Sequence, residues 1–110
     1  VHWAKKACNS FKDSSIEILD LRSLLPFDKE AIERSVKKTG KVLILHEDCL
    51  TGGIGGELSA YISEHFFELL DAPIIRCASM DTAVPFVKAL EDQFLANRTL
   101  NEKLQHLIDY

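Results

Sequence analysis

Apolar residues follow two alternating periodicities along the first half of the chain. Residues 2–11 place five apolar side chains at helical spacing, which predicts an amphipathic helix. Residues 15–21 are rich in β-branched and aliphatic side chains and predict a strand. Asp28 and Gly40 suit the N-cap and the left-handed C-cap of a helix between them. Residues 41–46 include four consecutive apolar residues, typical of a strand covered on both faces.

The second half repeats this alternation. A glycine-rich turn leads into a long helix from about residue 53 to residue 70, whose apolar positions form one stripe. Residues 74–77 predict a third strand, and residues 87–94 and 100–108 predict two further helices. The order strand, helix, strand, helix, strand predicts an α/β fold with three layers, α/β/α, and a mostly parallel sheet. Because the chain opens on a helix and the sheet is small for so many helices, we expect a fragment of a longer chain.

Composition fits one domain over residues 1–110. Hydrophobic residues make up 46% and charged residues 27% of the chain, ordinary values for a globular protein. The formal net charge of −4 and the lack of a basic stripe argue against a nucleic-acid partner. No apolar run approaches the length of a membrane span, so we expect no membrane partner.

The three cysteines, Cys8, Cys49 and Cys77, show no CxxC spacing. We interpret them as free thiols rather than as a disulfide or a metal site, since zinc requires four close ligands. Free thiols indicate a reducing compartment, most simply the cytoplasm.

The glycine-rich turn at residues 51–57 follows a strand and opens a helix, where phosphate-binding loops occur. One interpretation is therefore an anion cradle of backbone N–H groups. Neither dinucleotide-binding nor P-loop spacing is present, however, and Glu57 would repel a phosphate. We favour the alternative, in which the glycines allow the helix to approach a strand or another helix closely.

His46 and Glu47 stand at the carboxyl end of the middle strand, the edge at which open α/β sheets bind ligands. An adjacent base and carboxylate could perform acid–base chemistry. Successive strand residues point to opposite faces, so we favour a structural or interface role instead. No catalytic, cofactor-binding or metal-binding residues are expected in this domain.

Five segments together are similar to the transketolase-type C-terminal domain, and they occur in the family's order. They are residues 16–28, 35–47, 51–57, 70–76 and 81–86. The last resembles the Asp-Thr-Pro-Val-Pro-Phe segment of the beta subunit of 2-oxo acid dehydrogenases. It favours that subunit over deoxyxylulose-phosphate synthase or transketolase itself.

The resemblance implies a parent enzyme that uses thiamine diphosphate and magnesium. Such an enzyme, of the pyruvate or branched-chain (2-oxoisovalerate) type, decarboxylates a 2-oxo acid oxidatively and acylates the lipoyl group of an acyltransferase component. The cofactor is held by other regions, so this domain alone is expected to be inactive. Its implied partners are the alpha subunit or region, a second beta copy and the acyltransferase.

The same resemblance suggests two sets of contact residues. The subunit interface is expected at Gly52, Gly53, Gly55, Gly56, Glu57, His46 and Glu47. Docking of the acyltransferase is expected at Asp71, Asp109 and Tyr110. For any single acid, an ordinary solvated charge is the competing interpretation. Two other functions stay open: a freestanding small-molecule-binding or regulatory module, and an independent enzyme based on His46 and Glu47.

One departure from the family concerns its first strand. The family domain has a strand before the helix at residues 2–11, and that strand lies between the equivalents of residues 16–21 and 42–46. Without it we expect a gap in the sheet with unpaired backbone groups on both sides. Another copy could fill this gap, the edges could close on each other, or further residues could precede Val1.

Overall fold

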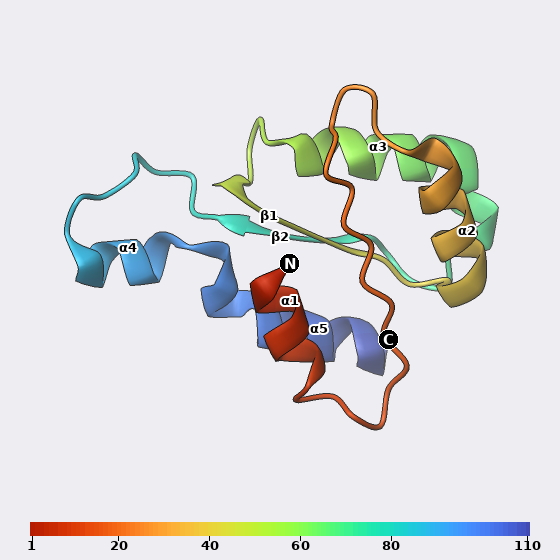
Figure 1. Ribbon diagram of the computed structural model, residues 1–110, viewed down its shortest axis with the longest axis horizontal. Coiled ribbons are helices and arrows are strands. Elements are labelled where there is room, and N and C mark those ends of the chain that lie inside the picture. Colours follow the sequence, from red (N-terminus) through yellow and green to blue (C-terminus); the bar gives the residue numbers. More distant parts are fainter.

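The computed structural model describes all 110 residues, and two parallel strands cross its centre (Figure 1). They are β1 (Leu43–Cys49) and β2 (Ile75–Ser79). Leu43 pairs with Ile75, and the pairing shifts register after Leu45. Because parallel neighbours need a crossover, the long helix α3 (Ile54–Phe66) connects the two strands.

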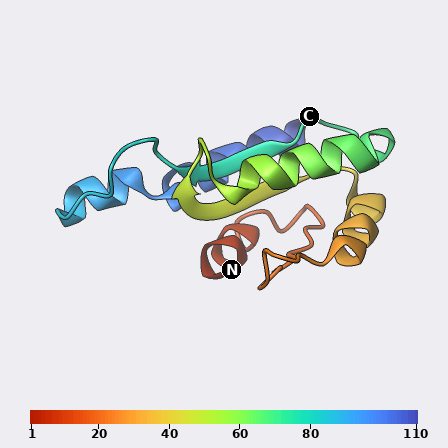
Figure 2. The ribbon, with the colours of Figure 1, turned by 90° about the horizontal axis from the view of Figure 1, so that it is seen from above.

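Helices and one extended segment surround this sheet (Figure 2). The other helices are α1 (His2–Cys8), α2 (Lys29–Thr39), α4 (Lys88–Phe94) and α5 (Leu100–Asp109), with short 3-10 helices at Phe67–Leu69 and Ala96–Thr99. All five helices predicted from the sequence are therefore present. The exposed loop at residues 80–87 precedes α4, and the 3-10 helix Ala96–Thr99 precedes α5.

Two hydrophobic clusters confirm the three-layer arrangement. One joins α2 and α3 to one face of the sheet: Ile32, Val36, Ile44, Leu58 and Ile62. The other joins α1 and α5 to the opposite face: Ala7, Cys77, Ala96, Leu100 and Leu104. The sheet is thus covered on both faces, as the apolar run in β1 predicts.

The boundaries of α2 follow from its end residues. The Asp28 carboxylate accepts a hydrogen bond from the backbone N–H of Ala31 at 3.0 Å. Gly40 closes the helix with φ 71°, a conformation that favours glycine, and its N–H donates to Val36 O at 2.9 Å. Both caps were predicted from the sequence, and both are confirmed.

The prediction of a strand at residues 15–21 is wrong in the structure. The segment is extended, but none of its N–H groups donates to another backbone carbonyl. A strand exists only where a neighbour completes its hydrogen-bond ladder, and no strand lies beside this one. The sheet has two strands rather than three. The helix predicted for residues 53–70 is shorter than expected. In the structure α3 ends at Phe66, and the chain continues as the 3-10 helix Phe67–Leu69.

None of the helices is both long enough and apolar enough to cross a lipid bilayer.

Candidate functional site

The glycine-rich turn carries the chain from β1 into α3. Gly52 has φ 79°, which allows the reversal there. Gly53 is the N-cap of α3 in an extended conformation, and the N–H of Gly56 donates to its carbonyl at 3.2 Å. Glu57 is exposed in the first helical turn, where its carboxylate complements the helix dipole.

The inner glycines of this turn make room for the imidazole ring of His46. A Cβ atom added to Gly55 would lie 2.5 Å from Nε2 of His46 and 2.8 Å from its Cδ2. A Cβ on Gly53 would lie 2.6 Å from Cε1 of the same ring and would also collide with the carbonyl of Cys49. Only glycine at these two positions lets α3 start directly above β1. The structure therefore shows the close approach of helix to strand that the sequence favours.

The outer glycines have different surroundings. A Cβ on Gly52 would meet nothing within 4 Å, and one on Gly56 would meet only Nη1 of Arg76 at 3.6 Å. These two glycines and Glu57 form a surface that we name the outer glycine face. The space above Gly52 is open in the isolated chain, whereas Gly56 is half-buried beside the Arg76 guanidinium.

His46 and Glu47 do not converge on one site. Both ring nitrogens of His46 are buried and have no hydrogen-bond partner. Glu47 is exposed, and its backbone carbonyl accepts a hydrogen bond from the hydroxyl of Ser79. Because the ring nitrogens of His46 are buried and the side chain of Glu47 is exposed to solvent, the two residues cannot act on the same molecule.

A polar contact that the sequence did not predict ties this turn to the loop after β2. Asp81 accepts hydrogen bonds from the N–H of Thr51 at 2.8 Å and from its hydroxyl at 2.6 Å. These hydrogen bonds from Thr51 lower the pKa of the Asp81 carboxyl below its usual value. An exposed Asp in a loop gives no sequence signal of such a partner, because the two residues meet only after the crossover has folded.

Two of the three docking candidates border one shallow groove. Asp71 and Tyr110 line a surface depression of about 530 Å³ together with Phe67, Leu70 and other residues of the same edge. The third candidate, Asp109, is exposed at the end of α5, where Nε2 of Gln105 donates to its carboxylate at 2.8 Å. Asp71 and Tyr110 thus line the same groove, although they are far apart in the sequence.

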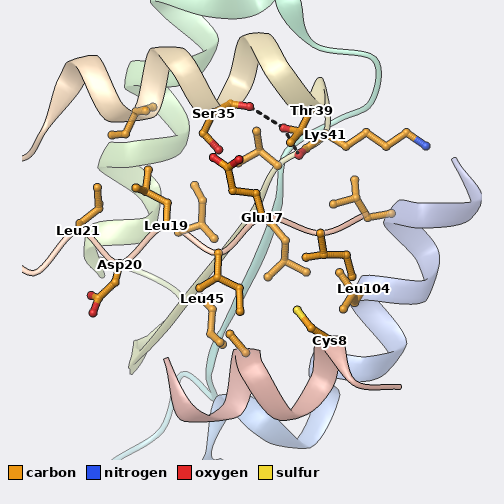
Figure 3. Close-up of a pocket in the computed structure, with 18 of the residues that line it drawn as sticks. Cys8, Glu17, Leu19, Asp20, Leu21, Ser35, Thr39, Lys41, Leu45 and Leu104 are labelled. Carbon is orange, nitrogen blue, oxygen red and sulfur yellow. Dashed lines mark hydrogen bonds between the residues drawn. The ribbon is translucent and has the colours of Figure 1, made fainter. Parts of the chain in front are cut away.

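A second cavity, of about 510 Å³, lies between β1 and the extended segment at residues 15–21. Its lining is mostly apolar, and Figure 3 shows Leu19, Leu45 and Leu104 around it. The free edge of β1 faces this cavity, because Leu43 and Leu45 point their backbone groups away from β2. The gap expected in the sheet is therefore present, and its two edges do not close on each other. Partial burial in the cavity wall raises the pKa of the Cys8 thiol.

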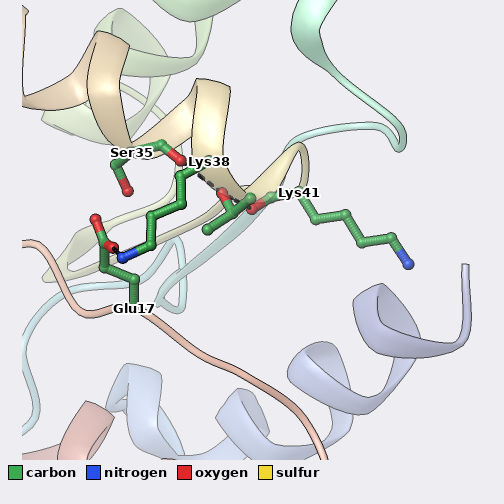
Figure 4. Close-up of polar contacts among 5 residues, drawn as sticks. Glu17, Ser35, Lys38 and Lys41 are labelled. Carbon is green, nitrogen blue, oxygen red and sulfur yellow. Dashed lines mark hydrogen bonds and ion pairs between the residues drawn. The ribbon is translucent and has the colours of Figure 1, made fainter.

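Glu17 connects the extended segment to α2 through an ion pair with Lys38 at the rim of this cavity (Figure 4). Its carboxylate accepts a hydrogen bond from Nζ of Lys38 at 2.7 Å. Hydrogen bonds from Lys38 and then Ser35 lower the pKa of Glu17. Lys38 belongs to the last turn of α2, just before β1, so this pair places the start of the extended segment beside the start of β1.

The loop after β2 and the following helix project from the body of the molecule (Figure 1). We name residues 80–90 the apolar arm, because its exposed side chains are largely hydrophobic. They include Met80, Val84, Phe86, Val87 and Leu90. Residues 81–86 belong to a segment that resembles the family, but the sequence did not predict their exposure, since an apolar loop residue looks like a core residue until its surroundings are known.

No cluster of three or more His, Cys, Asp or Glu side chains is arranged to hold a metal ion.

Comparison with known families and proteins identifies what the chain is similar to. Residues 1–99 match the family described as the C-terminal domain of transketolase. A 2-oxoisovalerate dehydrogenase subunit beta from Bacillus subtilis is 43% identical over 100 residues, which cover 88% of this chain and 31% of that protein.

Two further relatives come from a plant and an alga. The mitochondrial 2-oxoisovalerate dehydrogenase subunit beta 2 of Arabidopsis thaliana is 45% identical over 76% of this chain and 24% of its own length. The pyruvate dehydrogenase E1 component subunit beta of Porphyra purpurea is 52% identical over 68% of this chain and 23% of its own length. The chain thus spans less than a third of the length of each of these relatives.

Proposed function

This chain belongs to the transketolase C-terminal domain family, and we propose that it is the assembly and docking domain of the decarboxylating component of a 2-oxo acid dehydrogenase. The observation that carries the proposal is the 43–52% identity to beta subunits of pyruvate and 2-oxoisovalerate dehydrogenases. The parent enzyme would oxidatively decarboxylate a 2-oxo acid and acylate the lipoyl group of an acyltransferase. Its thiamine diphosphate and magnesium would be held by regions outside this chain.

The assembly role rests on the outer glycine face. Gly52 leaves open space where another backbone could approach, Gly56 lies half-buried beside Arg76, and Glu57 is exposed in the same turn. The space beside Gly53 and Gly55, by contrast, is occupied by the ring of His46. These two glycines are therefore needed for packing within the domain itself. Of the seven predicted interface residues, the outer three and the exposed Glu47 are therefore the ones available to an alpha subunit or a second beta copy.

The docking role rests on the groove bordered by Asp71 and Tyr110. A partly apolar lining with the Asp71 carboxylate at its edge suits a partner that carries a basic side chain beside a small hydrophobic contact. Asp109, the residue before Tyr110, adds a further exposed carboxylate. The partner would be the acyltransferase component.

The compartment follows the parent enzyme. The predicted cytoplasmic location stays a prediction, because some relatives are mitochondrial or chloroplastic proteins by name.

One substitution tests assembly with the domain left intact. Gly56→Leu places a side chain on the outer glycine face, and its Cβ would make an ordinary contact of 3.6 Å with Nη1 of Arg76. In the complete enzyme it is expected to weaken subunit association, measured by sedimentation velocity, because overpacking at an interface costs about 1–3 kcal/mol. Unchanged association would contradict the assembly role. Calorimetry of this chain with thiamine diphosphate is expected to show no binding heat, and tight binding would contradict the assignment of the cofactor elsewhere.

A further inference from the structure

The carboxylate of Asp71 packs against the glycine that ends α2. A Cβ atom added to Gly40 would collide with Oδ2 of Asp71 and would lie 3.0 Å from its Cγ. The backbone N–H of Asp71 also donates to the carbonyl of Gly40 at 2.7 Å. Gly40 is buried and Asp71 is exposed, so the acidic side chain lies over the glycine and occupies the space that a Cβ would need.

Two properties of glycine are used at this position, and they can be separated. The φ of 71° closes α2, but asparagine can also adopt this left-handed conformation. The lack of a side chain is required by Asp71 alone, because the next neighbour of a Cβ atom, the carbonyl oxygen of Leu69, would lie at an ordinary distance of 3.5 Å. An asparagine at position 40 would therefore keep the helix end and disturb the Asp71 carboxylate.

The carboxylate of Asp71 has no basic partner within the chain, since it takes part in no ion pair. The three lysines nearest to Gly40 in sequence have other partners. Lys37 pairs with Glu33 at 2.9 Å, Lys38 pairs with Glu17 at 2.7 Å, and Nζ of Lys41 donates to the carbonyl of Ile108 at 3.2 Å. An exposed carboxylate that is packed on one side and unpaired on the other is available to a cationic group of another molecule.

We propose that Gly40 is a positioning residue for docking: it leaves the space that holds the Asp71 carboxylate at the edge of the groove, where it pairs with an Arg or Lys side chain of the acyltransferase component. The inference rests on the docking role proposed above and adds a residue that does not itself line the groove. A side chain at Gly40 would displace the carboxylate at little cost to the fold, because the end of the Asp71 side chain can change rotamer. Docking would weaken, since a charge held in place loses less conformational freedom on binding than a mobile one.

The test measures the affinity of the complete enzyme for the acyltransferase component by isothermal titration calorimetry. Asp71→Ala is expected to raise the dissociation constant by about tenfold, because it removes one partner of a charge pair at the interface. Gly40→Asn is expected to raise it by a similar factor, and the double variant is expected to bind no more weakly than Asp71→Ala alone. Asp71→Glu keeps the charge but moves it by one methylene group, and it is also expected to weaken docking. Glu68→Gln is the matched control with unchanged affinity, because Glu68 is an exposed acid next to Phe67 that does not line the groove.

Salt titration supplies a second measurement that a purely structural role would not change. Gly40→Asn and Asp71→Ala are expected to reduce the salt dependence of binding to the same extent, because both remove the same charge from the contact. Unchanged affinity in Gly40→Asn or in Asp71→Glu, losses that add in the double variant, or an equal loss in Glu68→Gln overturns the inference and leaves the docking role standing. Unchanged affinity in Asp71→Ala contradicts Asp71 as a docking residue, and the inference then fails with it.

Discussion

Substituting Gly55 by Ala tests the packing that positions the glycine-rich turn. The added Cβ would lie 2.5 Å from Nε2 of His46, closer than real Cβ contacts allow, and 3.5 Å from Cγ2 of Ile44. The ring cannot easily move, because its nitrogens are buried between β1 and the start of α3. Overpacking of this kind typically costs about 1–3 kcal/mol.

Gly56→Ala is the matched control one residue later in the same helical turn. Its Cβ would make only an ordinary contact of 3.6 Å with Arg76. Both substitutions gain the same helix propensity, up to about 1 kcal/mol and less in a first turn. That gain cancels in the comparison, so Gly55→Ala should be less stable than Gly56→Ala by about 1–3 kcal/mol.

Denaturant titration of both variants measures this difference, and thermal melts offer a second readout. A loss of 1 kcal/mol lowers the melting temperature of a domain of this size by roughly 4–8 °C. The His46→Ala background isolates the cause, because without the ring Gly55→Ala should lose most of its penalty, a coupling of at least about 1 kcal/mol. Equal stability of the two alanine variants, or an undiminished penalty in that background, would refute the reasoning.

Two further predictions concern pH and the cavity beside β1. The pKa of Asp81 is lowered by its hydrogen bonds from Thr51, so its contribution to stability is present above the ordinary pKa of about 3.9 and disappears as the pH falls through the lowered value. Asp81→Asn should therefore be less stable than the parent at neutral pH and equal to it in strong acid; a constant difference in urea midpoints across that range would contradict this. A version with about ten native residues ahead of Val1, enough for one strand, should melt at a higher temperature and scatter less light than this chain. Identical melting temperatures, with this chain monomeric, would show that the family's strand order does not apply.

Local signals in the sequence predicted the helices well. Asp28 and Gly40 define α2 because a cap acts on backbone groups only a few residues away. The close packing favoured for the glycine-rich turn is present at Gly53 and Gly55, but the sequence did not identify His46 as the partner that requires these glycines; all three were placed together in the predicted subunit interface. The hydrogen bonds between Thr51 and Asp81 escaped prediction altogether, since 30 residues and a crossover separate their two sides.

The segment at residues 15–21 shows why strands are harder to predict than helices. Its composition favours a strand, and the backbone is extended as predicted, but a helix satisfies its own hydrogen bonds whereas a strand depends on its neighbours. Leu43 and Leu45 present unpaired backbone groups across a cavity of about 510 Å³, and the segment presents its own from the other side. Helices cover both faces of this space, so a strand placed there would be apolar on both faces. Residues 15–21 therefore stay extended without forming a strand, because no neighbouring strand in the structure completes their hydrogen-bond ladder.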